Sequence, residues 1–383
     1  MAYDGNDRAG LQGYRHVWQV TSPTTQEGRT RQLMDAQWNE RYSRQILFAE
    51  IGAAGQERLG ASSAVIIGCG ALGTALANLL VRAGLGKLRI VDRDFVEASN
   101  LQRQTLFEEA DAREALPKAV AAERRLAAIN SEATIEGVVD DVTPANVHEL
   151  LGGFPLLLDG TDNFETRLLI NDYSVTSGIP WVYAAVVASY GVTMTIRPGE
   201  TACLACLIEL DSDPGASEES VAAGAEPTCD TAGVLGPAAG VIASMEAISA
   251  IKLLIGKFEA RDDRLASYDV WSGRYQAIQV PRRANCRACA RHDFRFLNGE
   301  AQPHVTMCGR DSVQIHERRR QLDLPALARS LAAAGSEVRH NEFLLRFHVP
   351  PYELTVFSDG RTIVKGTRSP AVARSLYARY LGA

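Results

Sequence analysis

The sequence lacks an excess of positive charge, and it lacks long apolar runs. Lys and Arg number 40 against 46 Asp and Glu, which gives a net charge of −6 at pH 7. Proteins that bind nucleic acid usually carry a basic stripe, so no nucleic-acid partner is expected. No uninterrupted apolar stretch reaches the roughly 20 residues of a membrane span, and the N-terminus has no apolar signal-peptide core. We therefore expect a cytoplasmic protein without a membrane partner.

Cysteines are few and odd in number, which argues against a disulfide framework. Seven are present, and four of them form two pairs of the same spacing, Cys203-x-x-Cys206 and Cys286-x-x-Cys289. Reduced thiols fit a cytoplasmic setting. Because the pairs lie far apart in the sequence, their spacing alone fits a four-thiolate metal site and two metal-free buried pairs about equally well.

The order of apolar runs predicts an α/β fold. The length of 383 residues suggests two or three domains. Residues 1–33 are polar and aperiodic, so we expect a disordered N-terminal extension. Short apolar runs at 64–67, 88–91 and 156–158 alternate with helical spacing after residue 71 and over 118–128. This predicts a doubly wound, mainly parallel sheet within a domain spanning 34–290.

The remaining residues predict a second, smaller unit. Residues 291–305 are typical of a linker, and 306–383 predict a small C-terminal α/β domain. Its one cysteine, Cys308, does not lie in a strand-to-helix anion loop, which disfavours a sulfurtransferase. We expect a docking domain with a ferredoxin-like arrangement.

A glycine loop follows the first predicted strand and precedes a helix, and it reads Gly68-Cys69-Gly70-Ala71-Leu72-Gly73. Glycines let the backbone approach a phosphate, and a helix N-terminus offers free N–H donors. Asp92 ends the next predicted strand, where an acid can bind a ribose. The pattern predicts a Rossmann-like nucleotide site, with Cys69 as a small buried residue. By itself it does not separate NAD from ATP.

Cations downstream of the loop favour ATP. Arg103 and Lys118 follow the segment Asp92-Arg93-Asp94, and a dehydrogenase has no need for several cations around its nucleotide. Polyphosphate chemistry does need them, because Arg, Lys and a metal ion stabilise charge on the transferring phosphoryl group.

Taken in order, these motifs resemble those of the ThiF/MoeB/HesA family, bacterial relatives of ubiquitin-activating enzymes. The resemblance covers roughly residues 38–290. Its motifs are Arg41-Tyr42-Ser43-Arg44-Gln45, the glycine loop, Asp92-x-Asp94, Ser99-Asn100-Leu101-Gln102-Arg103-Gln104, Pro117-Lys118, Asp159-Gly160-Thr161-Asp162-Asn163, the cysteine pairs, and the segment from Thr228-Cys229 to Pro237. One departure is Ala71, where the family often has glycine, but a backbone N–H remains there.

The resemblance implies ATP-dependent adenylation of the C-terminal glycine of a small sulfur carrier protein like ThiS or MoaD. Such a carrier ends in Gly-Gly and serves thiamine, molybdopterin or another thio-cofactor pathway. By similarity, Asp92 would hold the ribose, and Asn100, Arg103 and Lys118 would contact the phosphates. Asp162 would bind Mg²⁺, although a helix N-cap before Phe164 is the plainer interpretation of that residue.

The resemblance also assigns the other site residues. Arg44 would reach the site of a partner in a homodimer, and Cys229 would accept the activated carrier as a thioester or acyl-disulfide. The four paired cysteines would hold a structural Zn²⁺. The full nucleotide-binding set is Gly68, Gly70, Ala71, Gly73, Asp92, Asp94, Asn100, Gln104 and Asn163.

Three alternatives remain open at this point. An NAD-dependent oxidoreductase would use the same glycine loop. A family sibling could activate a peptide, another carboxylate or a tRNA base without a carrier. A non-enzymatic scaffold could bind ATP and release no pyrophosphate.

Overall fold

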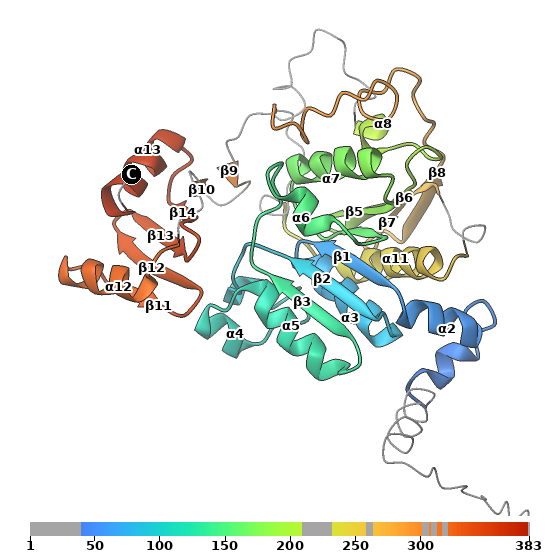
Figure 1. Ribbon diagram of the computed structural model, residues 1–383, viewed down its shortest axis with the longest axis horizontal. Helices are drawn as coiled ribbons and strands as arrows, with labels where there is room; N and C mark the ends of the chain where they lie inside the picture. Colours follow the sequence, from blue (N-terminus) through green and yellow to red (C-terminus); the bar gives the residue numbers. More distant parts are fainter. Residues whose placement is uncertain are drawn as a thin grey trace, which may run out of the picture.

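The computed structural model describes residues 40–208, 232–257, 263–300, 306–307, 312–315 and 321–381, and these form two separate sheets (Figure 1). The N-terminal extension expected at 1–33 and the predicted transfer residue Cys229 lie outside the described residues.

The larger sheet has eight strands in the order β3-β2-β1-β4-β5-β6-β7-β8. In chain order they are β1 (Ser63–Ile67), β2 (Lys87–Val91), β3 (Thr134–Val138), β4 (Leu157–Asp159), β5 (Trp181–Val187), β6 (Tyr190–Ile196), β7 (Leu265–Asp269) and β8 (Arg274–Ile278). The accompanying helices are a helical stretch at 40–46, α2 (Gly52–Gly60), α3 (Ala71–Ala83), the 3-10 turn η1 (Ala98–Asn100), α4 (Glu109–Glu114), α5 (Lys118–Ile129), α6 (Val147–Leu151), α7 (Phe164–Ser177), α8 (Leu204–Ile208) and α11 (Gly236–Leu254).

The first five strands are parallel, which confirms the predicted sheet. Strand β1 pairs in parallel with β2 on one side and β4 on the other, so the strand order reverses at β1. From β5 to β8 the pairing is antiparallel. In doubly wound sheets, ligands bind at the carboxyl ends of the strands where the order reverses. The glycine loop follows β1 at this point.

Helices cover both faces of this sheet (Figure 1). Ile66 of β1 packs in a core shared with Leu76 of α3 and Ile242 of α11. Its neighbours Val65 and Ile67 join the opposite core with α6 and α7. Alternate side chains of a strand point to opposite faces, so a short apolar run predicts a strand buried on both sides.

Helix α11 is the one described helix that is long and apolar enough to cross a membrane by length and composition. Half of it is buried inside the protein, and a core helix passes the same test. Its buried residues include Ile242 and Glu246.

The second sheet, together with its two helices, is called the C-terminal unit below. Its order is β11-β12-β13-β14-β10-β9, and its pairings are antiparallel. Its elements are β9 (Thr306–Met307), β10 (Ser312–Ile315), α12 (Leu324–Ala333), β11 (Val338–His340), β12 (Leu344–Val349), β13 (Tyr352–Phe357), β14 (Thr362–Lys365) and α13 (Pro370–Leu381). The sheet has six strands, and β11 to β14 follow one another as an antiparallel meander. The expected ferredoxin-like arrangement is therefore wrong.

Candidate nucleotide site

The backbone of the glycine loop is in contact with the backbone just after β4, at Gly68 and Gly160. Gly68 has a φ of +93°, a conformation that glycine adopts without strain. A Cβ built on Gly73 would lie 2.0 Å from the Gly68 carbonyl oxygen, and one built on Gly160 would lie 2.2 Å from the same atom. Helix α3 begins at Ala71. Gly70 precedes it and has no side chain to cap the helix. The first N–H groups of α3 are therefore suited to a phosphate.

Asp92 lies just after β2, beside this loop. One carboxylate oxygen accepts the N–H of Cys69 at 2.5 Å, and the other accepts the N–H of Asp94 at 2.7 Å. Burial raises the pKa of Asp92, although Lys118 opposes the shift. Cys69 is fully buried, as predicted. The Asp92 carboxylate is thus fixed next to the glycine turn.

Lys118 opens α5 and turns toward the same strand end. Its ammonium lies 3.1 Å from the Asp94 carboxylate, and its side chain is only 5% exposed. Its backbone N–H also donates to the Asp94 carbonyl at 2.8 Å. These contacts hold a buried cation beside the segment that carries Asp92.

The predicted phosphate-binding segment, residues 99–104, lies against α3. The Thr105 N–H donates to the Thr74 hydroxyl at 3.2 Å, which anchors the segment to the first turns of that helix. Arg103 donates to the Ser99 carbonyl at 2.9 Å. Asn100 and Gln104 are buried, yet Nδ2 of Asn100 and Oε1 of Gln104 have no hydrogen-bond partner among the residues that the structure describes. Buried polar atoms are normally paired, so these two fit a polar ligand.

The loop that leads to Asp162 rests on a buried ionic network. The Asp159 carboxylate accepts Nε of Arg167 at 3.1 Å and the hydroxyl of Thr161 at 2.7 Å. Glu246 of α11 accepts the Asp159 N–H at 3.0 Å. Burial raises the pKa of Asp159 and raises that of Glu246 well above its ordinary value. Burial therefore disfavours the charged form of Glu246.

Asp162 itself is exposed, and Asn163 is the residue that caps α7. The Asn163 side-chain oxygen accepts the Thr166 N–H at 2.8 Å. The interpretation of Asp162 as the cap is therefore wrong, while Asn163 is engaged in capping. Burial alone would lower the pKa of Arg93, but nearby carboxylates, Asp162 among them, raise it. Asp162 thus lies within electrostatic reach of the Asp92–Asp94 segment.

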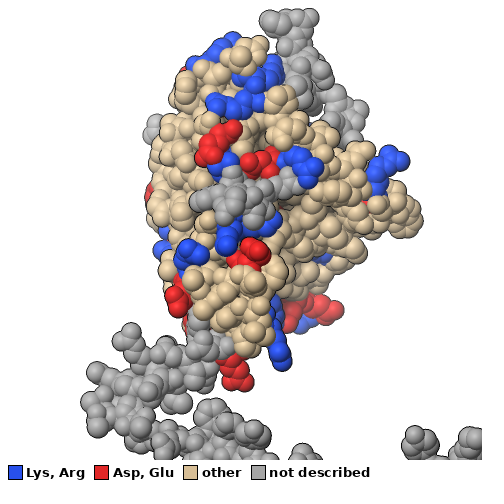
Figure 2. All heavy atoms as spheres, turned by 90° about the vertical axis from the view of Figure 1, so that its right-hand side faces the viewer, with Lys and Arg blue, Asp and Glu red and all other residues tan. Residues whose placement is uncertain are grey.

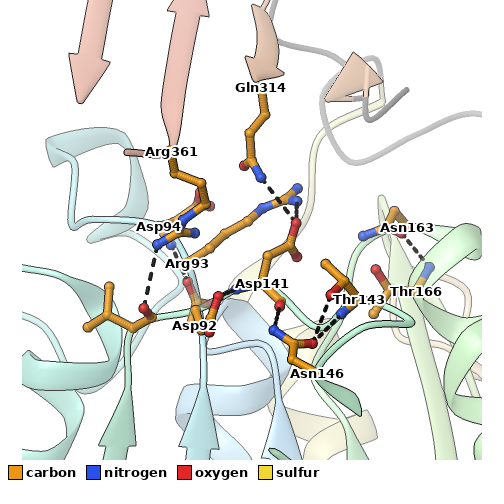
Figure 3. A network of polar contacts seen from close by, with 12 residues as sticks. Asp92, Arg93, Asp94, Asp141, Thr143, Asn146, Asn163, Thr166, Gln314 and Arg361 are labelled. Carbon is orange, nitrogen blue, oxygen red and sulfur yellow. Dashed lines mark hydrogen bonds and ion pairs between the residues drawn. The ribbon is translucent and has the colours of Figure 1, made fainter. Parts of the chain in front are cut away.

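Arg93 joins this edge of the sheet to the C-terminal unit (Figure 3). Its guanidinium donates to Oδ2 of Asp141 at 2.7 Å. Gln314 of β10 donates to the same oxygen at 3.2 Å. Two segments far apart in the sequence therefore share one carboxylate next to Asp92.

Arg44 is not brought to the site within one chain. Its helical stretch packs on the far ends of the two site helices, because Arg41 donates to Asn130 after α5 and Gln45 donates to the Ala83 carbonyl at the end of α3. The glycine loop lies at the opposite end of α3, whose 13 residues span about 20 Å.

The four paired cysteines form one cluster. The sulfur atoms of Cys203, Cys206, Cys286 and Cys289 all lie within 4.8 Å of one another. Individual Sγ–Sγ distances are 4.0 Å for Cys203–Cys206, 3.6 Å for Cys203–Cys286 and 3.5 Å for Cys206–Cys289. Four thiolates at about 2.3 Å from a tetrahedral zinc would stand roughly 3.8 Å apart. The cluster therefore fits a zinc ion.

Helix α7 holds both cysteine pairs in place. The Asn171 side-chain oxygen accepts the Leu204 N–H at 2.7 Å, next to the first pair. Asp172 forms a buried ion pair with Arg287, which lies inside the second pair. The helix that begins at Asn163 thus connects the cluster to the nucleotide site.

Sequence reasoning missed the buried charges that support the site. Arg167 lies eight residues after Asp159. This spacing suggests a contact between them only when it is known that β4 ends at Asp159 and that α7 follows. Glu246 is one acid in a long apolar helix, and nothing local distinguishes it from a solvated charge. Asp141 and Gln314 are paired across the two sheets, which no periodicity reveals.

A phosphate-suited glycine turn at the reversal point of a doubly wound sheet, with Asp92, Asp94 and Lys118 gathered beside it, defines an α/β nucleotide-binding enzyme. Comparison with known proteins makes the class specific. Residues 42–288 match the model of the ThiF family, and the chain belongs to that family.

The relatives agree on the class of enzyme. The chain is 44% identical over 346 residues to the sulfur carrier protein ThiS adenylyltransferase of Bacillus subtilis, which covers 89% of this chain and 99% of that protein. The protein of the same name from Escherichia coli is 35% identical over 250 residues, covering 65% of this chain and 94% of its own length. This chain is thus an adenylyltransferase of the ThiF type. The solved structure of E. coli MccB with succinimide shares the fold, with a TM-score of 0.56 and 23% identity over 65% of this chain and 74% of that one.

Proposed function

We propose that this protein adenylates the C-terminal glycine carboxylate of a small ubiquitin-like sulfur carrier protein ending in Gly-Gly. A carboxylate oxygen of the carrier attacks the α-phosphorus of ATP, and the bond from that phosphorus to the bridging oxygen breaks. The products are the carrier acyl-adenylate and pyrophosphate. The observation that carries this proposal is the meeting of the glycine turn, Asp92 and the Lys118–Asp94 pair at one sheet edge.

In this proposal the site residues bind different parts of ATP and its Mg²⁺. Asp92 binds the ribose, while Asn100, Arg103 and Lys118 contact the phosphates. The unpartnered Nδ2 of Asn100 supports its role, because it is a buried donor. Asp162 holds Mg²⁺, and its exposure supports this, because Mg²⁺ usually keeps several waters when a carboxylate binds it. A metal ion and several cations together stabilise the charge that develops on the phosphates.

The names of the relatives support a sulfur carrier as substrate, and on the family resemblance we assign it to thiamine or molybdopterin biosynthesis. The B. subtilis and E. coli proteins are both named for the carrier ThiS. We assign adenylation to residues 34–290, a linker to 291–305 and a separate domain to 306–383. We place the protein in the cytoplasm.

We propose a homodimer in which Arg44 completes the site of the partner. Its helical stretch packs at the end of α3 opposite the glycine loop of its own chain, so Arg44 can act at a nucleotide site only if that site belongs to another chain. Leu47 and Phe48 follow it and are 74% and 56% exposed. Exposed apolar side chains beside one another often mark a protein contact. Figure 2 shows the face at the right of Figure 1, where charges of both signs are scattered over a wide uncharged surface.

Zinc is proposed as a structural ion at the cysteine cluster. Four thiolates leave no coordination position for water, so the ion would tie Cys203 and Cys206 to Cys286 and Cys289 rather than take part in adenylation. The cluster lies among buried side chains of the α7 face, which supports a structural role.

A second step would pass the activated carrier to Cys229. Its thiolate would attack the acyl carbon, forming a thioester and releasing AMP. The support is positional. Cys229 precedes Ala232 by three residues, and α11 then begins where a Cβ on Gly236 would lie 3.2 Å from the Gln102 carbonyl oxygen.

The deciding experiment is mass spectrometry of candidate carriers after incubation with the protein, ATP and Mg²⁺. An AMP-sized mass increase on one carrier is expected, together with ATP–pyrophosphate exchange. Asp162→Ala and Arg103→Ala should abolish exchange while the protein remains folded. Arg113→Ala, which alters an exposed pair on α4, is the matched control and should exchange normally.

Other outcomes would replace the proposal with one of its rivals. ATP hydrolysis without any carrier adduct would indicate a family sibling with a different substrate. Thermal stabilisation by NAD and not by ATP would indicate an oxidoreductase. ATP binding without pyrophosphate release would indicate a scaffold.

A further inference from the structure

The C-terminal unit packs directly on the loops that carry the nucleotide site. Phe95 shares a small apolar core with Leu344, Phe357 and Ile363 of that unit. The guanidinium of Arg346 lies over the Phe95 ring, 4.2 Å from its centroid. Phe95 directly follows Asp94, so the contact lies on the segment that carries Asp92.

Polar contacts extend this packing to two further loops. Asn341 donates to the Glu114 carbonyl at 2.9 Å, shortly before Lys118. Arg361 donates to the Val139 carbonyl at 3.5 Å, and the neighbouring loop residue Asp141 accepts from Gln314. The unit therefore touches three of the segments at this edge of the large sheet, around Phe95, Glu114 and Val139.

These three segments are bonded to one another. The Asp92 N–H donates to the Val138 carbonyl at 3.1 Å, and the Val96 N–H donates to the Leu116 carbonyl at 2.8 Å. A shift of any one loop would therefore displace Asp92, Asp94 and Lys118 together. The C-terminal unit thus braces the positions of these side chains.

Two buried side chains of the unit each have a polar atom that lacks a hydrogen bond at this edge. Arg361 is 1% exposed and Gln314 is 9% exposed. Within the described part of the chain, Nη1 of Arg361 and Oε1 of Gln314 have no hydrogen-bond partner. Figure 3 shows Arg361 extending from its strand end toward the segment of Asp92, Arg93 and Asp94. The contact with Asp359 involves only Nε of Arg361, and it leaves Nη1 without a partner among the described residues.

We propose that the C-terminal unit forms one wall of the nucleotide site, and that Arg361 and Gln314 are positioning residues for bound ATP. They act through the Val139 and Asp141 loop and through Arg93, which together set the place of Asp92. The proposal rests on the proposed function for the identity of the ligand, a nucleoside triphosphate. It gives the C-terminal unit a task in nucleotide binding in addition to any docking role.

The test measures ATP affinity and turnover separately in the full-length protein. Isothermal titration gives the dissociation constant for ATP, and ATP–pyrophosphate exchange gives KM and kcat. Arg361→Ala and Gln314→Ala should each raise the dissociation constant and the KM for ATP about five- to tenfold, since each loses a hydrogen bond to the loop. The kcat should stay within about twofold of wild type, and KM for the carrier should not change.

Two further variants separate positioning from general damage. Arg361→Lys keeps the charge and should recover part of the lost affinity. Arg379→Ala removes an exposed cation from α13 of the same unit and should bind ATP as the wild type does. Gln314→Ala decides the matter if Arg361→Ala does not fold.

Unchanged ATP affinity in folded Arg361→Ala and Gln314→Ala would overturn the proposal. So would a loss of kcat with an unchanged KM for ATP. A wild-type protein that binds ATP but catalyses no exchange would instead refute the proposed function, and weaker ATP binding by the variants would still support the wall.

Discussion

Asp172 and Arg287 form a two-point buried ion pair, with Nη2 to Oδ1 at 3.1 Å and Nη1 to Oδ2 at 3.2 Å. The two residues come from α7 and from inside the second cysteine pair. Burial raises the pKa of Asp172, and the two hydrogen bonds from Arg287 oppose the rise. Because α7 begins at the Asp162 loop, this pair couples the cysteine cluster to the nucleotide site.

Arg287→Ala should destabilise the protein by about 3–5 kcal/mol, because it leaves a buried carboxylate without its partner. Urea denaturation monitored by circular dichroism measures the loss. Arg113→Ala, in an exposed pair, should leave the midpoint nearly unchanged. Equal urea midpoints for Arg287→Ala and wild type would show that water hydrates the Asp172 carboxylate in place of Arg287.

Loss of one cysteine should release zinc. Purified protein should contain about one zinc ion per chain, whereas Cys203→Ser should contain little and unfold at lower urea. Cys69→Ala removes a buried thiol outside the cluster and should retain the metal. Since zinc displaces protons from thiols, zinc affinity should fall as the pH is lowered. Full zinc content in Cys203→Ser would contradict a four-sulfur site.

Glu246 should make stability fall as the pH rises. Burial raises its pKa in the folded protein well above the ordinary value of 4.5, so above that pH the unfolded chain binds fewer protons than the folded one. Stability is therefore lost progressively from about pH 4.5 up to the folded pKa. Glu246→Gln removes this dependence, so its melting temperature relative to wild type should increase between pH 5 and pH 8. If the difference in melting temperature between Glu246→Gln and wild type does not vary with pH, Glu246 is charged in the folded protein.

The local parts of this site were predictable, and the parts that connect distant segments were not. The glycine turn, Asp92 after β2 and Lys118 at the start of α5 follow from short runs and helical spacing, which are local properties. Glu246 could not be predicted, because burial of an acid depends on how α11 packs across the sheet. The contact of Arg361 with Val139 joins residues 222 positions apart, and no periodic pattern records such a pairing.

Gly73→Ala should weaken ATP binding and destabilise the fold. Its Cβ would meet the Gly68 carbonyl oxygen, so the backbone of the turn must shift at a cost of about 1–3 kcal/mol. Gly240→Ala is the matched helical control, because a Cβ there meets no described atom within 4 Å. That control should gain roughly 0.5–1 kcal/mol. Normal ATP affinity in Gly73→Ala would show that phosphate does not approach this turn.

Complementation tests the partner role of Arg44. Homodimers of Arg44→Ala and homodimers of Arg103→Ala should both be inactive. A mixed dimer has one site with both arginines intact, so an equal mixture after subunit exchange should recover about a quarter of wild-type activity. Absence of recovery from demonstrably mixed dimers would place Arg44 outside the partner's site.

Because the two cysteine pairs lie far apart in the sequence, the ribosome makes the first pair well before the second. Cys203 and Cys206 leave the ribosome well before Cys286 and Cys289, and they have no sulfur partners until the later pair follows. The chain is made from its N-terminus, so the strands of the parallel half of the large sheet are complete while the cluster still lacks its second pair. The nascent protein therefore holds two unmatched thiols during the period in which β7 and β8 are being made.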